Sequence, residues 1–274
     1  MSSLAIINLV NALFGTNHSQ KSEVVYLNKE FVSRNLDKRF ADIFLQISDV
    51  TYHLEAQMTK DKNIVLRVFE YGFYHAMETR GEETDILHFP EPIVIYLDTE
   101  TDIPQTSELL IDFGEQGNFI YKVENFIYQN HEIRELNQKK MVILIPFKLL
   151  KLRNIVKENP TPENFAALQD LVLHDIIGSI KANLDVGNIT EDDADELKEL
   201  TLQLYQHIYQ HYEVLGGNDD MKQLIEGAME LPGDKYRNEI AELKEEKARI
   251  LEEKEKADAE ILELKRQIEE LQSK

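Results

Sequence analysis

Two acidic residues on neighbouring predicted strands form the part of the sequence best suited to chemistry. Residues 39–47 and 51–58 alternate apolar and polar side chains, which is typical of strands that bury one face. A tight turn between them, with the two apolar faces together, puts Asp42 directly opposite Glu55. Facing carboxylates repel each other, so either one is protonated or a cation lies between them. The pattern therefore raises the question of a metal ion.

Mg²⁺ or Mn²⁺ suits such a position, because these ions prefer oxygen ligands and often take only one or two carboxylates from the protein. Gln57 shares the face of Glu55, where it could orient a water molecule or contact a phosphate. A metal ion held there can activate water and stabilise charge on a phosphodiester. The alternative is an ordinary hairpin whose polar face, with His53, is exposed to solvent. Spacing alone does not exclude this commoner arrangement.

The segments around the hairpin predict a mixed α/β core. Apolar residues at helical spacing predict helices at residues 4–14 and 63–80. Apolar and β-branched runs predict further strands at residues 23–31, 92–97, 108–113, 119–123 and 141–145. The predicted order is one helix, three strands, a second helix and a fourth strand, followed by an extension.

Residues 4–155 resemble the PD-(D/E)xK nuclease superfamily. Asp42 on one strand, Glu55-Ala56-Gln57 on the next and a helix after it are similar to the nuclease core with an E-x-Q ending. More narrowly, the chain resembles the recombination-promoting nuclease/putative transposase family. The segments that carry this resemblance are residues 52–57, 63–67, 69–71, 89–97 and 144–147. The resemblance implies a restriction-endonuclease-like αβββαβ core, a mixed sheet and a metal-dependent DNA endonuclease.

The same resemblance implies roles for individual residues. Asp42 and Glu55 would bind Mg²⁺ or Mn²⁺, and Gln57 would stand where many members of the superfamily have a lysine. Arg67 and Tyr71, one turn apart on the second predicted helix, would contact phosphate or support the site. The alternative roles are a surface charge for Arg67 and a core aromatic residue for Tyr71.

The first predicted helix departs from the family pattern. The superfamily often supplies an acid from this helix, whereas residues 4–14 contain Asn8 and Asn11 as their polar residues. Asparagine is a weaker metal ligand than a carboxylate, so this departure implies a reduced metal site or a loss of activity. A catalytically inactive nuclease-fold binding protein is therefore the alternative function.

Composition restricts the partners. The chain has 274 residues, with 30 Lys and Arg against 51 Asp and Glu, a net charge of −21. This acidity argues against a non-specific DNA coat but leaves room for a local basic groove. The cations around the hairpin are Arg34, Lys38, Arg39, Lys60, Lys62 and Arg67. The absence of cysteine excludes disulfides and thiolate metal sites. With no apolar run of membrane-spanning length, we expect a soluble cytoplasmic protein without membrane contact.

The rest of the chain predicts helices. Residues 1–155 would form the nuclease-like domain, 160–230 a helical region, and 236–274 a coiled coil. Thr161-Pro162 and Thr190 are typical of helix starts. Heptad positions a and d of the last segment hold Ile240, Lys247, Lys254, Ile261, Ile268 and Leu243, Ile250, Ala257, Leu264, Leu271. This repeat favours a parallel homodimer over a single solvated helix.

Overall fold

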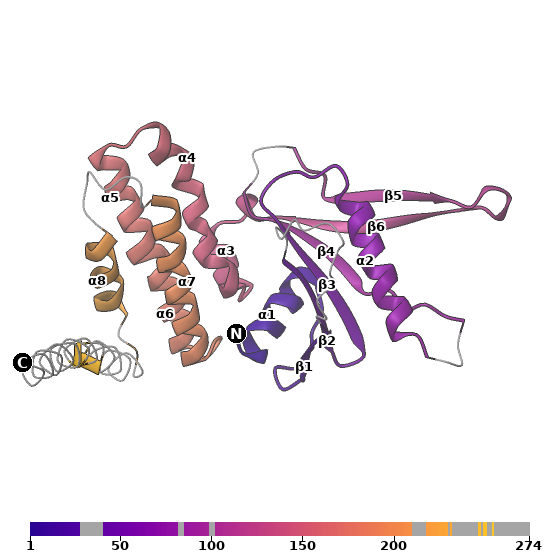
Figure 1. Ribbon diagram of the computed structural model, residues 1–274, viewed down its shortest axis with the longest axis horizontal. Helices are drawn as coiled ribbons and strands as arrows, with labels where there is room; N and C mark the ends of the chain where they lie inside the picture. Colours follow the sequence, from indigo (N-terminus) through magenta and orange to yellow (C-terminus); the bar gives the residue numbers. More distant parts are fainter. Residues whose placement is uncertain are drawn as a thin grey trace, which may run out of the picture. The chain divides into compact units, whose positions relative to one another are not determined.

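The computed structural model describes residues 1–27, 41–81, 85–98, 102–209 and 218–229, and residues 231, 246, 247, 249, 250 and 254 (Figure 1). Residues 41, 42 and 218–220 are described by their backbone. The chain divides into two units, Met1–Met229 and Glu230–Lys274. The predicted coiled coil lies almost entirely outside the described residues. The first unit is an α/β structure in which a mixed six-stranded sheet is followed by helices.

The sheet has the strand order β1-β2-β3-β4-β6-β5. Its strands are β1 (Val24–Tyr26), β2 (Ala41–Ile47), β3 (Val50–Gln57), β4 (Glu91–Tyr96), β5 (Thr106–Asp112) and β6 (Asn118–Ile127). β4 runs parallel to both β3 and β6, and the other pairs are antiparallel. The β5–β6 hairpin, closed by the short 3-10 helix η1 (Gly114–Gln116), extends beyond the rest of the sheet (Figure 1).

The hairpin between β2 and β3 has the predicted register. Asp42 pairs with Glu55, and Ile47 pairs with Val50 across the turn. Ser48 adopts a left-handed backbone conformation with a φ angle of 55°, which suits a tight two-residue turn. The order of the first elements, α1, β1, β2, β3, α2 and β4, is also the predicted one.

Two helices cover opposite faces of the sheet. α1 (Ser3–Phe14) ends at Gly15, whose positive φ angle of 65° is typical of a helix C-terminus. Its Phe14 ring lies 4.7 Å from the ring of Tyr52 on β3. α2 (Ile64–Thr79) carries Arg67, which contacts Glu55 on the same strand. Because Tyr52 and Glu55 are an odd number of residues apart, their side chains lie on opposite faces.

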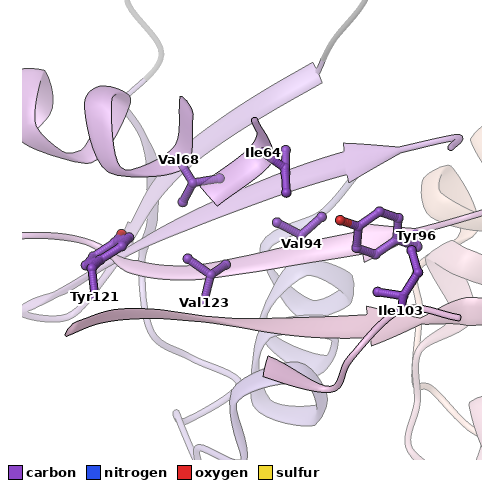
Figure 2. Packing of buried hydrophobic residues seen from close by; sticks show 7 residues of the cluster. All are labelled: Ile64, Val68, Val94, Tyr96, Ile103, Tyr121 and Val123. Carbon is purple, nitrogen blue, oxygen red and sulfur yellow. The ribbon is translucent and has the colours of Figure 1, made fainter. Parts of the chain in front are cut away.

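A compact apolar cluster attaches α2 to the sheet. Figure 2 shows Ile64 and Val68 of the helix above side chains of the central strands. The buried members of this cluster are Ile64, Val68, Val94, Tyr96, Ile103, Tyr121 and Val123. The α2 crossover therefore covers the polar face of the β2–β3 hairpin. The alternative of a solvent-exposed polar face is wrong, because His53 and Glu55 are both 0% exposed.

The second half of the first unit is helical. It contains η2 (Tyr128–Asn130), α3 (Ile133–Gln138), η3 (Val142–Leu149), α4 (Leu150–Glu158), α5 (Pro162–Asp170), η4 (Leu171–Ile177), α6 (Gly178–Asp185), α7 (Glu191–Tyr209) and α8 (Asn218–Ala228). The strand predicted at residues 141–145 is wrong, because this segment enters the 3-10 helix η3. A short continuous apolar run fits a buried strand and a buried helix equally well.

Hydrogen bonds connect the first residues of the described chain to α7. Thr190 caps this helix, and Asp193 accepts hydrogen bonds from the Thr190 backbone N–H and hydroxyl, both at 2.9 Å. Asp193 also accepts hydrogen bonds of 2.5 Å from the backbone N–H and the hydroxyl of Ser2. Asn8 of α1 donates to the backbone oxygen of Asn188, before α7, at 3.0 Å. These contacts join α1, which supports the sheet, to the helical half.

Candidate functional site

Strand β3 places three polar side chains beneath α2. Side chains alternate along a strand, so His53, Glu55 and Gln57 share one face, while Tyr52 and Leu54 face α1. All three polar residues are buried. Burial of a carboxylate is expensive unless it is paired, so the surroundings of Glu55 define the chemistry of this face.

Glu55 is held by two donors. Its Oε1 atom accepts a hydrogen bond of 2.5 Å from Nη2 of Arg67 and another from Nε2 of Gln57. Its Oε2 atom is buried and accepts no hydrogen bond from the described part of the chain. The carboxylate therefore has one saturated oxygen and one oxygen that is still able to accept a ligand.

Arg67 joins two acids. Its Nη1 atom lies 2.7 Å from Oδ2 of Asp61, in the loop between β3 and α2. The other carboxylate oxygen of Asp61 accepts the backbone N–H of Asn63 at 2.9 Å, which fixes the loop at the start of the helix. Ile64 and Val68 anchor this part of α2 in the core and so bring Arg67 to the sheet. The predicted position of Arg67 on α2 is confirmed, and its contact with Glu55 is a feature that the sequence did not reveal.

The Arg67 guanidinium changes the charge balance inferred from the sequence. Two facing carboxylates needed a proton or a cation, and a positive group is already present at Glu55. The backbone register places Asp42 opposite Glu55 as predicted. The side chain of Asp42 lies outside the described residues, so the structure establishes the register of this pair rather than the position of its second carboxylate.

The remaining predicted residues lie around the same face. Gln57 is bound to Glu55 and pairs in register with Tyr96 of β4. Burial raises the pKa of Tyr96, the negative charge of Asp61 raises it further, and the positive charge of Arg67 opposes both. The ring of Tyr71 lies 6.4 Å from the ring of His53. The fold thus gathers Glu55, Gln57, Arg67 and Tyr71 between β3 and α2.

Aromatic and imidazole rings continue this face. Phe44 of β2 stacks on His53 at 4.1 Å between ring centroids and on His75 of α2 at 5.0 Å. Burial lowers the pKa of His75, which favours its neutral form. Sequence reasoning missed His75 as a neighbour of the site. The available signal was its spacing of four residues from Tyr71, which puts both on one side of the helix.

The asparagines of the first helix serve other purposes. Asn8 binds the backbone of Asn188, and Asn11 donates to the backbone oxygen of His18 at 3.0 Å. The side-chain Oδ1 atom of Asn11 accepts a hydrogen bond from the His18 backbone N–H at 2.8 Å. These three hydrogen bonds hold loops on the α1 side of the sheet, away from the face of Glu55. Neither asparagine contacts Glu55 in these hydrogen bonds.

The donor set is small for a metal centre. Within the described side chains, no group of three or more histidine, aspartate or glutamate residues is arranged to hold a metal ion. The open Oε2 atom of Glu55 is a suitable oxygen ligand, and Asp42 is the second acid at the facing register position. Two carboxylates and several waters are a usual ligand set for Mg²⁺. Among the described side chains, the structure offers such an ion one open carboxylate oxygen, Oε2 of Glu55, and the backbone register alone places the second acid.

Comparisons of the chain with models of protein families, with curated proteins and with solved structures found no match. Among the described residues, the structure contains no helix that has both the length and the apolar character needed to cross a membrane.

Proposed function

We propose that the chain is a metal-dependent DNA endonuclease built on a PD-(D/E)xK-like core, of the recombination-promoting nuclease/putative transposase type. One observation carries the proposal: the register pairs Asp42 with Glu55 on adjacent strands. Support also comes from the element order α1, β1, β2, β3, α2, β4, which is the αβββαβ order of that core.

Asp42 and Glu55 would hold Mg²⁺ or Mn²⁺, and Glu55 would use its open Oε2 atom. When bound, the ion would supply Lewis acidity and would lower the pKa of a water for attack on the phosphodiester. Gln57 keeps the Glu55 carboxylate in position through its hydrogen bond to Oε1. Gln57 stands where many members of the PD-(D/E)xK superfamily have a lysine, so the transition-state charge would have to be neutralised by the ion and by nearby cations.

DNA would approach over the loop between β3 and α2. Lys60 and Lys62 are exposed on either side of Asp61 in this loop. Lys60 donates to the backbone oxygen of Asp102 at 3.1 Å, which directs it across the neighbouring loop. Arg34, Lys38 and Arg39, the other predicted cations, lie outside the described residues. A local group of lysines is needed, because the net charge of −21 repels DNA elsewhere on the protein.

Cleavage of supercoiled plasmid in the presence of Mg²⁺ tests the proposal. We expect wild-type protein to nick or linearise the plasmid, and Asp42→Asn and Glu55→Gln each to abolish the Mg²⁺-dependent cleavage, because each removes a proposed ligand of the ion. Glu108→Gln is the matched control, since Glu108 forms an exposed ion pair with Lys122 on the β5–β6 hairpin. Equal cleavage by wild type and both site variants would exclude this function.

A second candidate is a catalytically inactive nuclease-fold binding protein that oligomerises through its coiled coil. The ion pair between Arg67 and Glu55 favours it, because a guanidinium neutralises one proposed ligand. Melting temperature under MnCl₂ titration separates the candidates, since a ligand that binds the native state alone raises it. A wild-type protein without this rise and without cleavage would support the second candidate.

A further inference from the structure

The guanidinium of Arg67 stands between a buried acid and a partly exposed one. Its Nη2 atom is 2.5 Å from Glu55 and its Nη1 atom is 2.7 Å from Asp61. The Glu55 side chain is 1% exposed, that of Asp61 30%, and that of Arg67 17%. One cation thus connects the strand that carries the proposed metal ligand to the loop at the edge of the site.

A divalent ion and this guanidinium would compete for Glu55. Both are cations, and in a buried site their mutual repulsion is weakly screened by solvent. An ion bound at Oε2 would share its carboxylate with Arg67 at Oε1. Each would therefore weaken the binding of the other.

We propose that the ion pair between Arg67 and Glu55 acts as an electrostatic latch. Arg67 contacts Asp61 at the same time. In the metal-free protein the latch neutralises Glu55 and lowers the affinity of the site for Mg²⁺ or Mn²⁺. When the ion binds, Arg67 keeps its contact with Asp61 and releases Glu55. This inference rests on the proposed function, because it takes Glu55 to be a metal ligand.

Two features of the geometry allow this exchange. Arg67 uses different nitrogens for its two acids, so the contact with Glu55 can open while the contact with Asp61 stays closed. Asp61 is also fixed by the backbone N–H of Asn63 and remains a preformed partner. A guanidinium that leaves Glu55 is therefore not left as a buried unpaired charge, which would be strongly unfavourable.

Calorimetric titration with MnCl₂ tests the latch without any measurement of activity. Removal of the competing charge in Arg67→Met should tighten Mn²⁺ binding about 5- to 150-fold, the usual range for coupling between two ligands. Arg67→Gln is a second variant, which keeps a neutral hydrogen-bond donor near Glu55. It can be measured even if Arg67→Met fails to fold. Arg153→Met is the matched control, because Arg153 forms an ion pair with Asp98 elsewhere. Its Mn²⁺ affinity should equal that of wild type.

The outcomes separate the latch from the proposed function. Tighter Mn²⁺ binding in both Arg67 variants, abolished by adding Glu55→Gln, supports the latch. If wild type binds Mn²⁺ through Glu55 and the Arg67 variants bind it with unchanged affinity, the latch is wrong and the proposed function stands. If wild type and both Arg67 variants all fail to bind Mn²⁺, Glu55 is not a metal ligand and both proposals fall.

Discussion

At the scale of single residues, Glu55 shows how a charged group is kept inside this protein. A buried carboxylate is tolerated when its charge is compensated and its oxygens are bonded. Arg67 compensates the charge and Gln57 bonds the same oxygen, while Oε2 accepts no hydrogen bond from the described residues. The residue is thus stabilised by specific partners and still retains a ligand position.

The ion pair predicts a strong energetic coupling between Glu55 and Arg67. Arg67→Met should lower the free energy of unfolding by about 3–5 kcal/mol, because it leaves Glu55 buried without its cation. Adding Glu55→Gln to this variant should recover much of the loss, since the remaining group is neutral. Urea unfolding in EDTA of wild type, both single variants and the double variant measures the coupling. Strictly additive effects would show that the two groups are not coupled.

At the scale of elements, the register of the β2–β3 hairpin could be predicted from the sequence, but the position of α2 over this hairpin could not. The parity of apolar residues in residues 39–47 and 51–58 allows one register, and β2 and β3 have it. The partner of Arg67 and the burial of His53 depend on where α2 crosses the sheet. No local pattern contains that information. The apolar run with β-branched residues at 141–145 predicts a strand, yet such a run does not reveal whether its neighbours are strands or helices, and the segment enters η3.

The contact between α1 and α7 predicts a pH dependence of stability. Burial alone would raise the pKa of Asp193, but hydrogen bonds from Ser2 and Thr190 outweigh it and lower the pKa below its usual value. Because the folded-state pKa is the lower one, Asp193 contributes its full stability above the unfolded-state pKa of about 3.9. That contribution is lost as the pH falls through the folded-state pKa.

Melting temperatures of wild type and Asp193→Asn between pH 7 and pH 3 test this dependence. Asp193→Asn should cost about 1–3 kcal/mol at pH 7, as expected for charge-assisted hydrogen bonds. The difference from wild type should stay constant down to about pH 5 and shrink below about pH 4. Asp192→Asn is the control, since Asp192 is exposed in the same helical turn. A difference that is as large at pH 3 as at pH 7 would contradict the role assigned to Asp193.

At the scale of the whole molecule, the proposed action on DNA would have to depend on local features, because the chain is strongly acidic. The 51 acidic residues outnumber the 30 basic ones, so the net charge gives no long-range attraction to phosphate, and the proposed contact with DNA would depend on a few lysines near the site. Weak binding of DNA to one such site would be strengthened in a dimer, which carries two sites. Two copies related by a two-fold axis can also reach both strands of a duplex. The heptad repeat of residues 236–274 is the segment of the sequence that predicts such pairing.

We therefore predict a homodimer that depends on this repeat. Sedimentation equilibrium should give twice the chain mass of 31.9 kDa for the full protein and a monomer for a chain that ends at residue 233. Leu264→Asp, at a predicted d position, should also give a monomer, because a charge in the seam opposes helix pairing. Glu263→Gln, at a neighbouring outward position, should leave the dimer intact. A shortened chain that remains dimeric would place the interface in residues 1–233 and remove the role given to the repeat.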